Sequence, residues 1–399
     1  MSDTSLPRLT RDAQRLLMLV QALTLSGSRL EDLHWENLLD ALLNKLLLGR
    51  KNKTVESVLD YMLAGELEGY EILFEHAETC SESALIQQDG QDYDALLISA
   101  PIVAWTRYRL PDGLLDAKQQ QQLAAGLQSN VLAEGAKLAL IPQLVNFDQM
   151  PQSFHETRLW TQRLALQALG GTAEPTIVGE PPHEDGMLAD ARFIVGVVVV
   201  PKGAPLFRWQ AEQSKPLPTR TDSLNLWSQI ATTTLATMFT GCQSEYLLPD
   251  AFYNNNREAD RRIRPMALKA AVTWLQTAAN LPPDELRAVI VGCGETTTQE
   301  YRVGFSTRHN NHVVYGCIWP VLSKEEALPE MMDSDHIAVP DEITALLKEL
   351  GLSEVRRLPG LYPAEFCDDC GAPSFPNAAG EMEHPELPDE TVMDPVQFH

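Results

Sequence analysis

The sequence is poor in basic residues and in long apolar runs. Only 31 Lys and Arg stand against 55 Asp and Glu in 399 residues, a formal net charge of −24. Nucleic-acid phosphates and anionic lipid surfaces are both bound through basic patches. The most apolar stretch, Phe193 to Pro201, is far shorter than the roughly 20 residues that span a bilayer. We therefore expect no nucleic-acid partner and no membrane association.

Several common motifs are also missing. The sequence contains no GxGxxG, P-loop, GxSxG or HExxH pattern, and its N-terminus has no basic segment followed by an apolar stretch and a small-residue cleavage site. Of the six cysteines, four are scattered and only Cys367 and Cys370 form a close pair. This pattern is typical of a reducing compartment with one metal or redox pair, so we expect a cytoplasmic protein without a disulfide framework.

What is present is a globular composition with two kinds of apolar periodicity. In the first ninety residues, leucines recur at spacings of mostly three and four, the clearest example being the segment from Leu30 to Leu48. We predict a helical module over residues 1–90. After it, apolar strand-like runs alternate with helical segments, which indicates an α/β or α+β domain with a mixed sheet over residues 91–362.

This second region contains a recurring order of an apolar strand, a helix, a glycine, a strand and a proline. We interpret it as three pseudo-repeated units, approximately residues 94–180, 191–295 and 299–362. The glycines would end helices and the prolines would end strands. The alternative is a coincidence among common strand–helix units. The marker residues are Gly135 and Pro142, Gly241 and Pro249, and Gly351 and Pro359.

The C-terminal region, residues 363–399, contains a candidate metal site. Cys367 and Cys370 have the CxxC spacing of a zinc knuckle, and Gly371 follows at the position of a tight turn. A hairpin turning at Pro376 to Gly380 would return His384 to the cysteines. The rest of the region is expected to be an acidic tail.

The chemistry of this cysteine pair remains open from the sequence. A structural zinc held by Cys367, Cys370 and His384 is one interpretation, and a redox-active pair or two free thiols are the others. Zinc takes four ligands in structural sites. The candidates for the fourth are Glu381, His399, Cys317 and water.

A second unusual segment runs from Tyr253 to Pro265 and is basic within an acidic protein. At helical spacing, Arg257, Arg261 and Arg264 share one face, and the asparagines at 254–256 are candidates for a helix N-cap. Such a face could bind a small anionic ligand. It could equally be an internal salt-bridge surface.

The corresponding stretch of the first unit, Phe147 to Arg158, is also polar and includes His155 and Glu156. If the two stretches face one cleft, these two side chains could supply an acid or base beside the arginines.

The sequence resembles a known family in several places. The segments are LTRDAQRLL and SGSRLED near the N-terminus, APIVAWTRY and READRRIRP in the middle, and FCDDCGAP and GEMEHPE near the C-terminus. Together they resemble an uncharacterised betaproteobacterial family, the domain of unknown function family 2863. The resemblance implies a bacterial cytoplasmic protein and carries no catalytic residue with it.

Two functions fit these observations. The first is a non-catalytic binding or scaffold protein that has a structural zinc site and engages a partner protein or a small anionic ligand. It follows from the lack of any complete catalytic constellation. The alternative is an enzyme acting on a small anionic metabolite in a cleft lined by the segment from Arg257 to Arg264. Whether the protein is an enzyme is not decided by its sequence.

Overall fold

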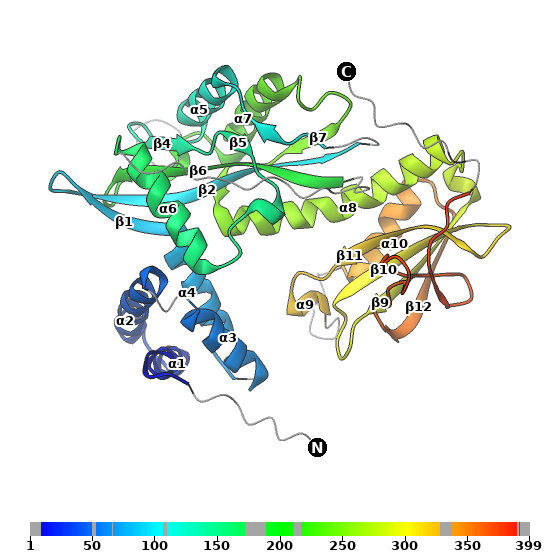
Figure 1. Ribbon diagram of the computed structural model, residues 1–399, viewed down its shortest axis with the longest axis horizontal. Coiled ribbons are helices and arrows are strands. Elements are labelled where there is room, and N and C mark those ends of the chain that lie inside the picture. Colours follow the sequence, from blue (N-terminus) through cyan, green and yellow to red (C-terminus); the bar gives the residue numbers. More distant parts are fainter. Residues whose placement is uncertain are drawn as a thin grey trace.

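The computed structural model is a mixed helix-and-sheet protein built around two sheets that one long helix connects (Figure 1). None of the helices in the described parts of the chain is both long and apolar enough to cross a membrane. The structure describes residues 9–49, 53–65, 67–106, 110–171, 189–210, 217–327, 337–388 and 391.

Four helices form the N-terminal module: α1 (Arg11–Thr24), α2 (Arg29–Leu48), α3 (Thr54–Ala64) and α4 (Tyr70–Glu82). Thr10 and Ser28 cap the first two by accepting hydrogen bonds from backbone amides. The predicted leucine stripes form their shared core. The helical region is shorter than predicted, because strand β1 (Ser83–Gln88) already pairs with the first sheet. Its alternating burial explains the difference.

The first sheet has the strand order β1-β2-β6-β4, with β7 and β8 also paired to β2. Its centre is the long antiparallel pair of β2 (Gln91–Trp105) and β6 (Ala189–Pro201). Helices α5 (Ala117–Asn130) and α7 (Arg220–Leu235) pack on one face. Helices α6 (Phe154–Ala168) and α8 (Phe252–Ala278) pack on the other. Because both faces are covered, β6 is apolar and buried almost throughout.

In this sheet, the later strands of each expected unit pair with the long strand of the other unit. The strand after α5, β4 (Lys137–Leu140), pairs with β6 of the second unit. The strands after α7, β7 (Gln243–Tyr246) and β8 (Asp250–Ala251), pair with β2 of the first unit. Gly135 and Gly241 both have a positive φ, 82° and 79°. Pro142 and Pro249 each lie in the short gap that follows, between β4 and β5 (Gln143–Leu144) and between β7 and β8.

The second sheet has the order β11-β10-β9-β12. It consists of β9 (Leu286–Cys293), β10 (Glu300–Thr307), β11 (Val313–Pro320) and β12 (Glu354–Tyr362). Helices α8 and α10 (Val339–Glu349) cover one face.

The remaining short elements of the described chain are β3 (Gly113–Leu114), η1 (Phe147–Gln149), η2 (Arg208–Gln210), η3 (Pro283–Glu285), α9 (Lys324–Ala327), β13 (Phe375–Pro376) and β14 (Met382–Glu383).

This sheet differs from the expected units in two ways. The strand β9, expected at the end of the second unit, pairs with β10 and belongs to the second sheet. The strand β12 pairs in parallel with β9, whereas β4 and β7 pair antiparallel to their neighbours. Pro359 lies inside β12, where the register shifts between Arg357 and Leu361. Local sequence predicts the order of helices and strands. It does not predict which strands pair with each other, because that depends on contacts between distant residues.

Buried polar contacts join the helical module to the first sheet. The guanidinium of Arg158 donates to the carbonyl oxygens of Cys80, at 2.9 Å, and of Ser83. The carboxylate of Glu82 accepts a hydrogen bond from the backbone amide of Tyr253, at 2.9 Å. Burial raises the pKa of Glu82 from 4.5 to about 7.

This shift predicts a pH-dependent stability. A raised pKa in the folded state favours the protonated carboxyl, so its contribution to stability is complete below pH 4.5 and is lost as the pH rises through about 7. In Glu82→Gln the amide oxygen still accepts the hydrogen bond but carries no charge. We expect the free energy of unfolding of this variant, relative to the wild type, to grow between about pH 5 and about pH 8 by at most about 3 kcal/mol.

Chemical denaturation at several pH values measures this difference. The control is Glu68→Gln, at an exposed position of the same module, whose difference from the wild type should not change with pH. A pH-independent difference for Glu82→Gln would contradict the assignment.

Candidate metal centre

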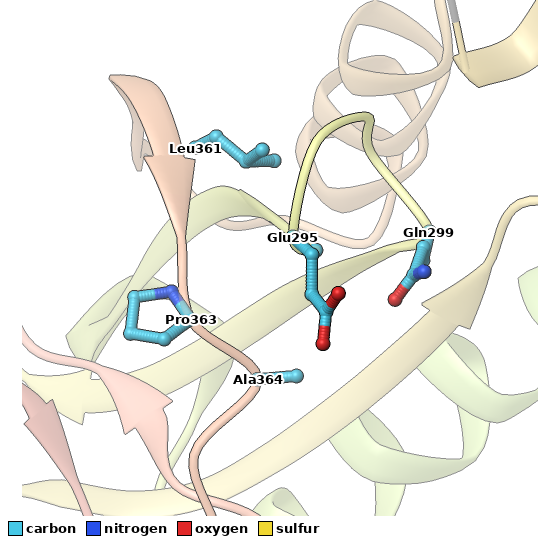
Figure 2. A pocket seen from close by; sticks show the side chains of 6 residues that line it. Glu295, Gln299, Leu361, Pro363 and Ala364 are labelled. Atoms are coloured by element: carbon cyan, nitrogen blue, oxygen red, sulfur yellow. The ribbon is translucent and has the colours of Figure 1, made fainter. Parts of the chain in front are cut away.

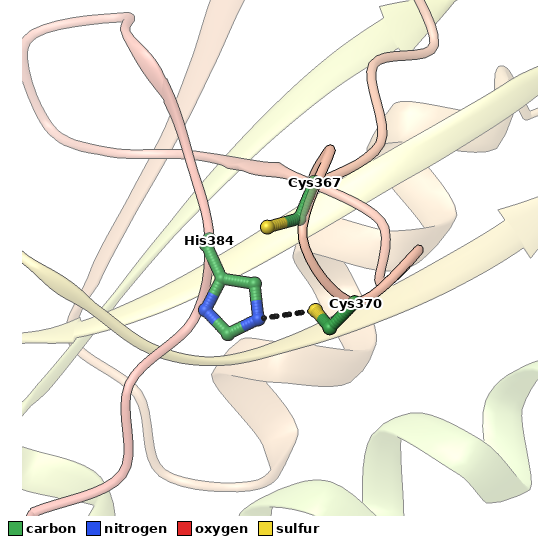
Figure 3. A group of neighbouring side chains, drawn as sticks. All are labelled: Cys367, Cys370 and His384. Carbon is green, nitrogen blue, oxygen red and sulfur yellow. Dashed lines mark hydrogen bonds between the residues drawn. The ribbon is translucent and has the colours of Figure 1, made fainter.

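The three predicted metal ligands lie together near the C-terminus (Figure 3). One ligand atom from each of Cys367, Cys370 and His384 lies within 4.8 Å of the other two. Sγ of Cys370 is 3.2 Å from Nε2 of His384. Cys370 and His384 are exposed and Cys367 is half-buried. Two sulfurs and one imidazole at this separation are a donor set that zinc favours.

A tight turn places the two cysteines. The amide of Gly371 donates to the carbonyl oxygen of Cys367 at 2.8 Å, and the amide of Cys367 donates to that of Ala372 at 2.7 Å. Gly371 has a φ of 73°, a conformation that glycine adopts without strain. Hydrogen bonds from the backbone amides of Asp369 and Cys370, and from the side chain of Cys370, lower the pKa of the Cys367 thiol.

A hairpin returns His384 to this turn. It pairs β13 with β14 and turns where the sequence predicted a turn. The side chain of Asn377 is the organising group: its Oδ1 accepts hydrogen bonds from the amides of Ala379, at 2.8 Å, and Glu381, at 3.0 Å. Asn377 is buried, and its hydrogen bonds hold the backbone of the turn in one conformation.

The hairpin docks on the second sheet at a pair of glycines. Gly304 and Gly316 lie opposite each other in the β10–β11 register. A Cβ at Gly316 would overlap the ring of Phe375, and one at Gly304 would overlap the backbone of Pro376. Only glycines therefore let the hairpin approach the sheet this closely.

Arg302, on β10, binds the chain on both sides of the cysteine turn. Its side chain is fully buried, and it donates from Nε to Glu300 at 2.7 Å. Its Nη1 donates to the carbonyl oxygens of Ser374, at 2.7 Å, and Glu365, at 2.5 Å. Through Nε and Nη1, this buried arginine ties β10 to the chain on both sides of the cysteine turn, whereas its Nη2 has no hydrogen-bond partner among the described residues. Sequence reasoning missed it, although an arginine between Tyr301 and Val303 in an expected strand was a visible signal.

We call residues 363–384, from the end of β12 to His384, the C-terminal clasp. Among the described residues, only the three ligands above form a group that could hold a metal. Cys317 is buried in the core of the second sheet, with Sγ 3.8 Å from the carbonyl oxygen of Ala267. The Glu381 carboxylate accepts a hydrogen bond from Asn377 at 3.2 Å. His399 lies outside the described residues, as does most of the expected acidic tail.

The arginine-rich segment lies within α8 and is paired with the protein's own carboxylates. Arg257 forms an ion pair with Glu78 on α4, at 2.6 Å. Arg261 lies 3.6 Å from Glu258. Arg264 is buried and binds Glu326 through both terminal nitrogens, at 2.8 and 3.2 Å.

The expected N-cap asparagines are inside this helix, which begins at Phe252 with Ala251 as its cap. Asn255 is buried there and donates to the carbonyl oxygens of Ser99 and Leu248. The prediction was wrong because β8 runs directly into α8 and leaves no separate capping turn.

His155 and Glu156 lie in the first turn of α6. Nδ1 of His155 is hydrogen-bonded to the carbonyl oxygen of Leu47 at the end of α2, at 2.5 Å. The Glu156 carboxylate accepts a hydrogen bond from the amide of Gln152 at 2.8 Å. Both side chains thus have structural partners at the junction between the helical module and the first sheet.

Fold and site together define a mixed α/β protein with a C-terminal Cys2His cluster. The chain belongs to a family described as a protein of unknown function (DUF2863), whose model matches residues 1–398. The chain shows no significant similarity to a curated protein. It also shows no significant similarity to a solved structure.

Proposed function

We propose that the protein is a non-catalytic binding or scaffold protein whose C-terminal clasp is fastened by a structural zinc ion. Cys367, Cys370 and His384 would hold the ion, and water would complete its coordination. The observation that carries this proposal is the convergence of three zinc-type ligand atoms from the cysteine turn and the end of the hairpin. A bound metal would add stability by linking the cysteine turn to the end of the hairpin.

The pairing of the arginines supports a binding role over catalysis. A cleft for an anionic metabolite needs cationic groups that are free to meet it. Arg257, Arg261 and Arg264 instead face Glu78, Glu258 and Glu326. This favours a structural role, in which Arg257 holds α8 against α4 and Arg264 holds it against the segment that follows β11, while Arg261 pairs within α8. The enzyme alternative therefore has no specific observation in its favour.

The proposal also covers the organisation and location of the chain. It divides into a helical module (1–90), a mixed α/β domain (91–362) and the C-terminal region (363–399). The reciprocal pairing of β4 with β6 and of β7 with β2 supports an internal duplication of the first two units. The site needs both cysteines as thiols, so we place the protein in a reducing compartment such as the cytoplasm.

Metal content measures the proposal directly. After dialysis against buffer with zinc and then without it, the wild type should retain about one zinc per chain, and Cys370→Ser and His384→Asn should each retain far less. Cys242→Ser and His309→Gln are the matched controls, since both residues lie outside the cluster. We also expect a chelator to speed proteolysis within residues 363–384.

Two results would count against zinc. Equal retention by the cluster variants and the controls would place any bound metal elsewhere. A wild type that carries no zinc, with clasp proteolysis unchanged by chelator, would instead support free thiols or a redox pair.

A further inference from the structure

A cavity of about 700 Å³ lies where the parallel strands β9 and β12 end, and none of its lining residues is a proposed metal ligand. Cys293 and Tyr362 are the last paired residues of the two strands, and the amide of Gly294 donates to the carbonyl oxygen of Tyr362 at 3.0 Å. Beyond this point the two chains separate. In α/β proteins, the carboxyl ends of parallel strands are where ligands commonly bind, because the diverging loops leave room there.

Two polar side chains of this cavity have no partner. Glu295 and Gln299 form no hydrogen bond or ion pair through their side chains with any described residue. Figure 2 shows the Glu295 carboxylate extending between Gln299 on one side and Pro363 and Ala364 on the other. Both side chains are exposed, so they are accessible to a ligand that enters the cavity and would offer it a carboxylate and an amide.

The loop that bears these groups is held firmly. A Cβ at Gly294 would overlap the carbonyl oxygen of Thr297, so the loop turns back sharply at this residue. The amide of Gln299 donates to the carbonyl oxygen of Cys293 at 2.8 Å, and the amide of Val321 donates to that of Gln299 at 2.9 Å. The backbone that carries Glu295 and Gln299 is therefore held in place at the edge of the cavity.

The opposite wall is apolar and uncovered. Leu361 is 40% exposed, and Pro363 and Ala364 continue the wall. Carboxylate and amide on one side, with aliphatic groups on the other, suit a ligand that has a polar head and a short hydrocarbon chain.

The charge of the cavity lining indicates whether the polar head of the ligand is a cation or an anion. Glu295 is the only charged residue among those that line the cavity. Neither Arg302, which is fully buried, nor Arg357, which lies 3.7 Å from Asp341, is part of this lining. The free charge facing the cavity is the Glu295 carboxylate, on a protein whose net charge is −24. Such a field attracts cations and repels anions.

We propose that this cavity binds a small organic cation, a primary amine or guanidinium with a short aliphatic chain. The ammonium or guanidinium group pairs with Glu295 and donates to the Gln299 amide oxygen, while the chain lies against Leu361, Pro363 and Ala364. This site includes Pro363 and Ala364 at the start of the clasp but uses none of the three proposed zinc ligands.

The test compares pentylamine with pentanoate, which have the same chain length and opposite charge, by ligand-detected nuclear magnetic resonance on the full chain. We expect saturable binding of the amine and none of the carboxylate. Glu295→Gln should weaken amine binding by about two- to fivefold, because Glu295 is exposed and an exposed ion pair contributes up to about 1 kcal/mol. Ala364→Trp, which places a bulky ring in the cavity beside Glu295, should weaken binding further.

Glu349→Gln is the matched control, because it removes an exposed carboxylate at the end of α10, outside the cavity lining, and should leave binding unchanged. If Ala364→Trp fails to fold, Glu295→Gln alone decides, since its side chain is exposed and unpaired. If Glu295→Gln and Glu349→Gln weaken amine binding equally, the amine is attracted by the overall negative charge and not by Glu295. That outcome, or the absence of saturable amine binding, would overturn the proposal.

Discussion

Replacing Arg302 with Met should lower the free energy of unfolding by about 3–5 kcal/mol, because breaking a buried ion pair leaves its partner uncompensated. Met fills much of the volume of the arginine stem but donates no hydrogen bond. The Glu300 carboxylate and the carbonyl oxygens of Glu365 and Ser374 would all lose a charged donor. Denaturant titration of the purified variant measures the loss.

The control for this variant is Arg356→Met on the same sheet. The Arg356 side chain is 51% exposed and pairs with Glu354 at 2.7 Å. Exposed pairs of this kind contribute about 0–1 kcal/mol, so the control should lose little. Losses of similar size in both variants would mean that Arg302 does not fasten the clasp as described.

The second large effect is expected from Gly316→Ala. The added methyl group would overlap the ring of Phe375, whose side chain is buried. Either the ring leaves its site or β11 shifts, and overpacking of this kind costs about 1–3 kcal/mol or more. Because β13 leads through the hairpin to His384, we also expect weaker zinc retention.

A double variant separates this clash from a general weakening of β11. Gly316→Ala combined with Phe375→Ala removes both overlapping groups, so its loss should be smaller than the sum of the two single losses. Gly27→Ala is the control, since nothing lies within 4 Å of a Cβ there. Additive losses in the double variant would show that Phe375 does not dock on Gly316.

Much of this architecture could be predicted because it depends on local periodicity and spacing. The leucine pattern from Leu30 to Leu48 gave helix α2 with only its first residue in error. The apolar run from Phe193 to Pro201 forms most of β6, because a strand covered on both faces is mainly apolar. The spacing of Cys367, Cys370 and His384 anticipated their convergence, because a CxxC turn and a short hairpin are both local structures.

What could not be predicted depends on contacts between distant residues. The partners of Arg257 and Arg264, Glu78 and Glu326, are 179 and 62 residues away along the chain. The role of Gly316 becomes visible only when Phe375 is placed on it. The cavity beside Glu295 likewise depends on the pairing of β9 with β12, which unite two regions that were expected to belong to different units.

X-ray absorption at the zinc edge of the full-length wild type tests the zinc clasp most directly. The account predicts a zinc ion with two sulfur ligands and one imidazole, at distances of about 2.3 Å and about 2.0 Å, completed by one oxygen. A protein without zinc, or zinc surrounded only by oxygen and nitrogen, would contradict it.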